Sequence, residues 1–273
     1  MGNILVEDDK KPTKKKAKAV VESVTENLVS TDKCNYMDLP SNGAMGYNAR
    51  VQYRDMLVED EERLASTTAE LYATTLNSVI KSVLNNNADF EKFALADRDY
   101  ALVWIWANNY TSKKKVGVTC MHCSNEFDAT VDLTALKVNP VKENFVKNMS
   151  LPIAKTGGSV TVRLSTIADE ILVEEYMKTK AGSYDYLMLI ASIDVGVPLM
   201  FDKKVEWVRN NVSTSELGRV KQYHRYFSFG LAPEIEHKCP KCQGVTKSTI
   251  PFQPSDILNP RVADDFEEFL RTN

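Results

Sequence analysis

The stretch CMHC, Cys120 to Cys123, places two thiols three positions apart, and CPKC, Cys239 to Cys242, repeats this spacing late in the chain. A C-x-x-C turn directs both sulfurs to the same side, where they can occupy one edge of a ligand tetrahedron. Strand-like segments flank each pair: KKVGVTC and NEFDATVDL, then EIEHKC and VTKSTIPF. Each pair is therefore predicted to lie at the tip of a β-hairpin, which is the arrangement of a zinc ribbon.

One structural zinc ion is the ligand that this pattern predicts, bound by the four thiolates of Cys120, Cys123, Cys239 and Cys242. The pairs are separated by 115 residues, so a shared ion would close a long loop and tie two parts of the chain together. Four thiolates leave no open coordination position, which argues against a catalytic zinc. Three alternatives stay open: a redox dithiol, cysteines without metal, and two separate sites that use His122 and His237. The redox dithiol is disfavoured because strands, and not a helix, follow both pairs.

Each turn also needs a residue that tolerates a positive φ after its second cysteine. Asn125 and Gly244 lie at matching places, two residues past the second cysteine, and both residue types adopt the left-handed conformation. We predict that these two residues adopt it here.

A weak internal repeat precedes the cysteine pairs. VQYRDMLVEDE, residues 51–61, aligns without gaps on VTVRLSTIADE, residues 160–170; the identical pairs are Val51 and Val160, Arg54 and Arg163, Asp60 and Asp169, and Glu61 and Glu170. Helical patterns and then a C-x-x-C hairpin follow each copy. The sequence thus predicts an α+β fold, rich in helices with short strands, whose two pseudo-repeated halves are joined by the zinc-ribbon-like hairpins. Chance similarity is the alternative, since only four positions agree.

Composition and charge divide the chain further. It has 273 residues, of which 43% are hydrophobic and 26% charged, and its net charge of −3 does not indicate a nucleic-acid binder. Residues 1–33 carry six lysines between positions 10 and 18 and are predicted to be a disordered tail, either a solvating arm or a contact for nucleic acid. Residues 34–260 are predicted to form one compact two-half domain, irregular over 137–152, and residues 261–273 a short acidic helix. No apolar run is long enough for a membrane span, and no membrane partner is expected.

Catalytic signatures are missing from the sequence. It has no H-E-x-x-H, G-x-S-x-G, G-x-x-x-x-G-K or G-x-G-x-x-G motif, and only three histidines. Asp60 with Glu61, and Asp169 with Glu170, are better explained as carboxylates at helix starts than as catalytic acid pairs. We therefore predict that the protein is not an enzyme.

Three longer stretches carry a family resemblance. DLPSNGAMGY followed by RDMLVEDEERL resembles the opening of the baseplate hub and hub-assembly proteins of T-even-type contractile-tail bacteriophages, where a leucine-proline-serine-x-glycine…tyrosine loop precedes a strand and an acidic helix. LADRDYALVWIWANNYTSKKKVGVTCMHCSNEFDATVDLTALKV and CPKCQGVTKSTIPFQPSDIL resemble the family's helix and two knuckles. The similarity covers residues 36–260. The chain departs from the family pattern in lacking a basic residue after Ser41 and a glycine near 111–113.

The resemblance implies a non-enzymatic protein of tail morphogenesis, either a component of the baseplate hub or a chaperone of its assembly. Its partners would be other tail and hub proteins, with nucleic acid not expected, and it would act in the host cytoplasm during assembly or in the baseplate of the finished tail. As a contact surface we hypothesise the loop containing Leu39, Pro40, Ser41, Gly43 and Tyr47. The alternative is that this loop packs on its own domain.

Two other functions compete with this interpretation. One is a zinc-ribbon nucleic-acid binder that uses the basic tail and Lys238, Lys241 and Lys247. The other is a thiol–disulfide enzyme. Salt-dependent DNA binding would favour the first, and freely reactive thiols in the metal-loaded protein would favour the second.

Overall fold

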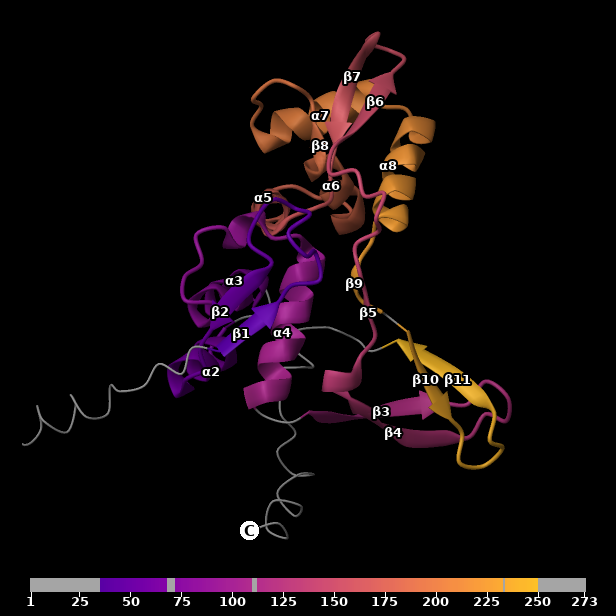
Figure 1. Ribbon diagram of the computed structural model, residues 1–273. Coiled ribbons are helices and arrows are strands. Elements are labelled where there is room, and N and C mark those ends of the chain that lie inside the picture. Colours follow the sequence, from indigo (N-terminus) through magenta and orange to yellow (C-terminus); the bar gives the residue numbers. More distant parts are fainter. Residues whose placement is uncertain (1–34, 68–71, 110–111, 233, 250–273) are drawn as a thin grey trace, which may run out of the picture. The chain divides into compact units, whose positions relative to one another are not determined.

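The computed structural model describes residues 35–67, 72–109, 112–232 and 234–249 (Figure 1). Over these residues it contains seven α-helices and eleven short strands, and every strand pairing is antiparallel. The predicted α+β, helix-rich class is confirmed. The basic tail predicted for residues 1–33 and the acidic helix predicted for 261–273 lie outside the described residues.

The first half, which we call the first module, begins with a hairpin of β1 (Asn35–Asp38) and β2 (Arg50–Tyr53). Three helices follow: α2 (Val58–Ala65), α3 (Tyr72–Val83) and, after the 3₁₀ turn η1 (Phe90–Lys92), α4 (Leu95–Asn109). The module ends in the first knuckle hairpin, β3 (Lys113–Thr119) with β4 (Glu126–Asp132). A second 3₁₀ turn, η2 (Leu133–Ala135), comes directly after it.

The second module repeats this order. β6 (Met149–Ile153) and β7 (Gly158–Val162) form its hairpin, to which β8 (Ile193–Asp194) adds a third strand. Its helices are α5 (Ile167–Met177), α6 (Tyr184–Ala191), α7 (Phe201–Asn211) and α8 (Thr214–Tyr226). Its knuckle hairpin is β10 (Glu234–Lys238) with β11 (Val245–Thr249), and β5 (Val138–Asn139) pairs with β9 (Gly230–Leu231) between the modules.

The repeat seen in sequence is a repeat of structure. The guanidinium of Arg54 binds the carboxylate of Asp60 with two hydrogen bonds, and Arg163 binds Asp169 in the same way. The amide of Arg54 donates to the carbonyl of Val83 (2.9 Å), and that of Arg163 to the carbonyl of Ser192 (3.1 Å). Equivalent residue numbers differ by 109 in all these pairs. The two modules therefore share both the strand-to-helix turn and its packing on the end of the next helix.

The equivalence extends to the last long helix of each module, where the numbers differ by 119. Asp97 and Glu216 are the third residues of α4 and α8. Asp97 accepts the amide of Ser41 (2.9 Å), and Glu216 accepts the amide of Ala154 (2.8 Å), so each helix start holds the hairpin loop of its own module. The second module has ten more residues before this helix, and α7 lies in that longer segment.

Part of the segment 137–152, which was predicted as irregular, forms strands: β5 lies within it, and β6 begins in it. Residues 149–153 form β6, an edge strand that contains Pro152 and pairs only with β7 among the described strands. Proline cannot donate to a ladder, so it is tolerated at an edge and hides the strand from pattern recognition.

The core runs through both modules. Its fully buried large side chains come from strands and helices of both modules and from the turn before α4, and include Phe90, Phe93, Leu76, Ile105, Ile153, Ile167, Leu187 and Ile193. Gly230 in β9 has φ +92°, and a Cβ atom there would lie 3.0 Å from the Cβ of Ala96, so only glycine lets this strand approach α4. None of the helices described here is both long and apolar enough to cross a lipid bilayer.

Candidate metal centre

The four predicted cysteines come together in space. Their Sγ atoms all lie within 4.8 Å of one another, although the two pairs are far apart in sequence. Cys120 Sγ is 3.6 Å from Cys242 Sγ, and Cys123 Sγ is 3.8 Å from Cys239 Sγ. Metal–sulfur bonds of about 2.3 Å in a tetrahedron give sulfur–sulfur edges of about 3.8 Å, whereas a disulfide needs about 2.05 Å. The cluster thus fits a tetrathiolate metal site, and the distances identify no particular ion.

Both knuckles are built by the same backbone hydrogen bonds. The amide of Cys120 donates to the carbonyl of Asn125, and that of Cys239 to the carbonyl of Gly244, both at 2.9 Å. In return the amides of Ser124 and Gln243 donate to the carbonyls of Cys120 and Cys239, again at 2.9 Å. These closed turns hold two thiols on one side of each hairpin before any ion binds.

The prediction about positive φ was wrong by one residue. Ser124 (φ 54°) and Gln243 (φ 62°) adopt the left-handed conformation, and Asn125 and Gly244 do not. The tight turn comes directly after the second cysteine, so residue type alone pointed to the wrong position. Gly244 has a different role: a Cβ there would lie 2.5 Å from Cδ2 of His122. Glycine makes room for the imidazole of the other knuckle.

Side chains between the hairpins fix their mutual position. The Oγ1 of Thr246 accepts the amide of Met121 (3.2 Å), and its hydroxyl donates to Cys120 Sγ (3.5 Å). This hydroxyl contact, together with hydrogen bonds from the backbone amides of His122 and Cys123, lowers the pKa of Cys120 to about 6, which favours the thiolate form that binds metals. Thr246 is only 1% exposed, and sequence reasoning missed it. Its polar side chain on the inner face of an alternating strand is the signal that could have found it.

The two histidines near the cysteines have other partners. The Nε2 of His122 lies 3.0 Å from the carbonyl oxygen of Val245, which makes this imidazole a link between the hairpins. The Nε2 of His237 lies 2.7 Å from the hydroxyl of Ser248 on the neighbouring strand. These contacts disfavour separate sites that use histidine ligands. The redox alternative is disfavoured as well, because β4 and β11 follow the knuckles where a thiol of low pKa would need a helix start.

The lysines proposed for nucleic acid do not form an open basic face. Lys247 Nζ lies 2.9 Å from a carboxylate oxygen of Glu234 and 3.9 Å from one of Glu236. Lys238 and Lys241 are exposed, on β10 and in the knuckle turn. The ribbon surface thus mixes both signs of charge, which lowers its attraction for phosphate.

The loop predicted as a contact surface is largely internal. Leu39, Pro40, Ser41 and Tyr47 are buried, and Gly43 is partly exposed with φ +78°. The hydroxyl of Tyr47 donates to the carboxylate of Asp97 and accepts the amide of Ala94 (2.9 Å). Burial raises the pKa values of both Tyr47 and Asp97, so this contact keeps its phenol proton at neutral pH. The arrangement matches the alternative of a loop packed on its own domain.

A buried polar network between the modules was also missed. The guanidinium of Arg98 in α4 binds the carboxylate of Glu170 in α5, and Asn77 of α3 donates to the same carboxylate (2.9 Å). Arg98 and Glu170 are only 8% and 5% exposed. Glu170 is indeed near a helix start, as predicted, but it also holds the second module to the first.

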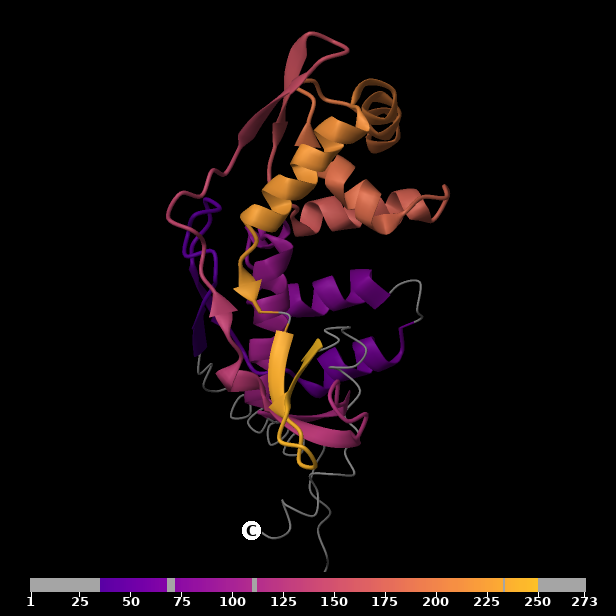
Figure 2. The same ribbon diagram turned by 90° about the vertical axis from the view of Figure 1, so that its right-hand side faces the viewer.

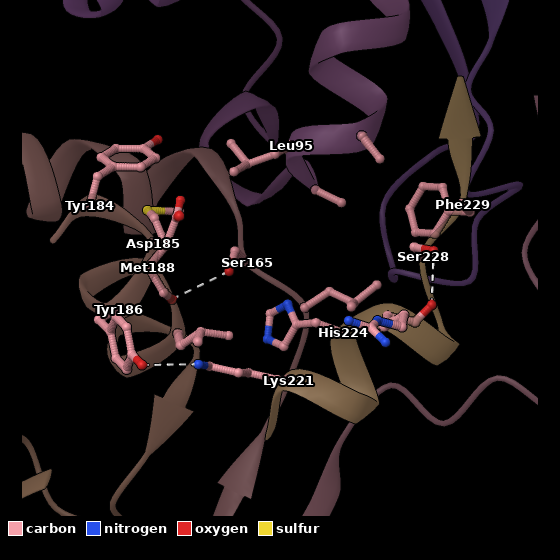
Figure 3. Close-up of a pocket in the computed structure, with 15 residues that line it drawn as sticks. Leu95, Ser165, Tyr184, Asp185, Tyr186, Met188, Lys221, His224, Ser228 and Phe229 are labelled. Carbon is pink, nitrogen blue, oxygen red and sulfur yellow. Dashed lines mark hydrogen bonds between the residues drawn. The ribbon is translucent and has the colours of Figure 1, made fainter. Parts of the chain in front are cut away.

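A cavity of about 600 Å³ lies near the starts of α4 and α6 (Figure 3). His224 of α8 points into it, and its Nε2 lies 3.0 Å from the hydroxyl of Ser192. That hydroxyl donates its proton to the carbonyl of Leu189 (2.7 Å), so it must accept from His224. Burial lowers the pKa of His224 to about 4. A serine whose proton is held by a carbonyl is not an activated nucleophile, and this pair is explained by packing.

Comparison with known proteins identifies the family. No curated protein and no solved structure shows a significant match to the chain. The family described as T4 bacteriophage base plate protein matches residues 29–243, which include the first module, the second module as far as its knuckle turn, and all four clustered cysteines. The resemblance drawn from the loop, helix and knuckle motifs is confirmed at the level of a T4-type baseplate protein. The chain belongs to the T4 bacteriophage base plate protein family.

Proposed function

We propose that this protein is a non-enzymatic part of baseplate morphogenesis that acts at the hub, as a hub component or as a chaperone of hub assembly, through contacts with other tail proteins. The family match over residues 29–243 is the observation that carries the proposal. Its site of action would be the host cytoplasm during assembly, and the tail baseplate if it stays in the particle.

The cofactor we propose is one structural zinc ion bound by Cys120, Cys123, Cys239 and Cys242. Sulfur–sulfur distances of 3.6 and 3.8 Å support a tetrahedral ion with bonds of about 2.3 Å, and zinc is the common ion of such thiolate sites. Bound zinc would supply no chemistry beyond cross-linking, because four thiolates fill its coordination sphere. The residues of the chain would do the rest: Thr246 and His122 align the hairpins.

The contact surface of the Leu39–Tyr47 loop becomes a narrower proposal. Its exposed residues are Asn42, Ala44, Gly46 and Asn48, whereas Leu39, Pro40, Ser41 and Tyr47 would support the loop from inside and Gly43 would shape its turn. Replacing Ala44 by lysine tests contact without straining the loop, because Ala44 is exposed and, unlike Asn42 (φ 46°), does not have a positive φ. Lost pull-down of tail proteins with an unchanged melting temperature would support the contact, and unchanged pull-down would contradict it.

The proposed function is tested by infection with a phage whose gene carries a nonsense codon. We expect tail assembly to stop before the baseplate is complete and to recover when the intact protein is supplied from a plasmid. Mass spectrometry of purified rescued particles then separates the two roles, because a component is present in them and a chaperone is not. Complete, infectious particles made without the protein would refute the proposal. Salt-dependent retention of DNA by the purified chain would favour the nucleic-acid alternative.

A further inference from the structure

The two modules of one chain are joined by a short antiparallel contact. The segment Phe93–Leu95, at the start of α4, runs beside Ser165–Ile167, at the start of α5. The amide of Ile167 donates to the carbonyl of Phe93 (3.0 Å), and the amide of Leu95 donates to the carbonyl of Ser165 (3.3 Å). Ile167 is completely buried there. We call Ser165–Ile167, at the start of α5, the socket, and Phe93–Leu95, at the start of α4, the plug that fills it. Figure 1 and Figure 2 show these two helices next to each other.

The repeat places a second socket in the first module. With the offset of 109, Ser165–Ile167 correspond to Met56–Val58 at the start of α2. The same capping box, in which the carboxylate of residue N3 accepts the amide of the N-cap, starts both helices. Val58 is 71% exposed where Ile167 is 0% exposed, and Leu57 is 55% exposed where Thr166 is 9% exposed. Among the described residues, nothing accepts the amide of Val58 or donates to the carbonyl of Met56.

The matching plug is present in the second module. With the offset of 119, Phe93–Leu95 correspond to Val212–Thr214 at the start of α8. Ser213 and Thr214 are exposed, and within the described ranges the carbonyl of Val212 and the amide of Thr214 have no hydrogen-bond partner. One chain thus carries an empty socket and an unused plug, whose donors and acceptors are complementary.

We propose that copies of this chain associate head to tail, with Val212–Thr214 of one copy paired against Met56–Val58 of the next. The Val58 amide would donate to the Val212 carbonyl, and the Thr214 amide to the Met56 carbonyl, as the internal contact does. A second copy is the occupant because it carries the complementary segment on the equivalent helix start, and because the contact repeats, on equivalent residues, one that the chain already makes internally. Such a heterologous contact closes a ring or extends a filament. This proposal is independent of the hub function.

The contact between copies is weaker than the internal one. Internally, Arg98 of α4 reaches Glu170 of α5 and seals the joint with a buried ion pair. The equivalent positions hold Leu217 and Glu61, so no such ion pair forms between copies. Association between copies is therefore weak, and a chain stays monomeric until assembly raises its local concentration.

Proline variants test the contact with little risk to the fold. Val58 and Thr214 are the first residues of α2 and α8, a position where proline is favoured and where the amide has no partner inside the helix. Val58→Pro and Thr214→Pro each remove one donor and place a ring carbon in the joint. Sedimentation velocity of the full chain over rising concentration should show association of the wild type. Each variant should associate at least about tenfold more weakly, with unchanged circular dichroism.

Mixing the two variants gives the decisive result. The Val58→Pro chain keeps its plug and the Thr214→Pro chain keeps its socket, so an equal mixture should form 1:1 dimers and no larger species. Met200→Asp changes an equally exposed residue (72%) elsewhere and should leave association unchanged. A wild type that is monomeric at every concentration, or association that survives both proline changes, would overturn the proposal. So would a socket that is covered only when a different tail protein is added.

Discussion

Removing the metal should destabilise this protein by a large, calculable amount. The proposed zinc ion would cross-link Cys123 to Cys239 across 115 residues. The chain-entropy relation for closing a loop of that length gives about 5 kcal/mol. Domains of ordinary size are stable by about 5–15 kcal/mol in total, so the cross-link is a large fraction of the whole. For a chain of this size we expect the melting temperature to fall by about 10–20 °C.

Calorimetry on three proteins measures this effect. Cys239→Ser removes a fully buried ligand, and Lys241→Ala changes an exposed residue of the same knuckle that is not a ligand. We expect one zinc per chain by elemental analysis in the wild type and in Lys241→Ala, and none in Cys239→Ser. Chelation should lower the melting temperatures of the wild type and of Lys241→Ala to that of Cys239→Ser, and added zinc should restore them.

The refuting results are specific. If the chelator removes the ion and the melting temperature does not change, the cross-link does not hold the two knuckles together. If Lys241→Ala loses as much stability as Cys239→Ser, the loss comes from the knuckle turn and not from the ligand. Thiols that react freely in the zinc-loaded protein would favour the redox alternative.

Three further predictions concern single side chains. Burial lowers the pKa of His224 from 6.5 to about 4, so as the pH falls the unfolded chain takes up this proton before the folded chain does. The free energy of unfolding should therefore fall by about 2 kcal/mol between pH 7.5 and 5, and His224→Gln should remove this loss in urea unfolding curves. Burial alone would raise the pKa of Asp60, but hydrogen bonds from Arg54 and the Leu57 amide outweigh it, and the pKa falls below its usual value. The stability that ionised Asp60 contributes is therefore present at neutral pH and lost in acid. Asp60→Asn should cost about 2–3 kcal/mol at pH 7 and nothing well below pH 3.8. Gly244→Ala should weaken metal binding about tenfold in chelator competition, and much less in a chain that also carries His122→Ala, because the added Cβ meets that imidazole.

Features set by local sequence were predictable. The flanking strands and the knuckle spacing located β3, β4, β10 and β11, and the two cysteine pairs converge as the ribbon pattern requires. The four identities of the repeat included Arg54 and Asp60, whose bidentate pairing is repeated by Arg163 and Asp169. Residues that make such a turn are constrained in type, and this is why a short alignment was informative.

Features set by tertiary contact were not predictable. Tyr47 lies in a stretch of turn residues typical of an exposed loop, yet it is buried. Its hydroxyl donates a hydrogen bond to the carboxylate of Asp97, fifty positions later, and this contact holds the loop against the domain. β6 alternates as a strand does, with Leu151 and Ile153 buried, but it contains a proline, a residue depleted in strands, so its pairing with β7 supplied what propensity did not. Thr246 and Gly244 serve the opposite knuckle, and nothing in their own hairpin requires them.

The two modules of one chain are related to each other in two different ways. In the ribbon, exchanging the two modules turns the pairing of Cys120 with Cys242 into that of Cys239 with Cys123, and both pairings are present. This reciprocity is the mark of a two-fold relation, which closes on itself. The joint between Phe93 and Ile167 would become one between Val212 and Val58, which the chain does not make. The modules therefore pack head to tail while their hairpins pair symmetrically, and the ten extra residues around α7 lie in the segment that must accommodate the difference. It follows that the metal site is complete in a single chain and the socket is not, so metal content should stay at one ion per chain whether or not copies associate.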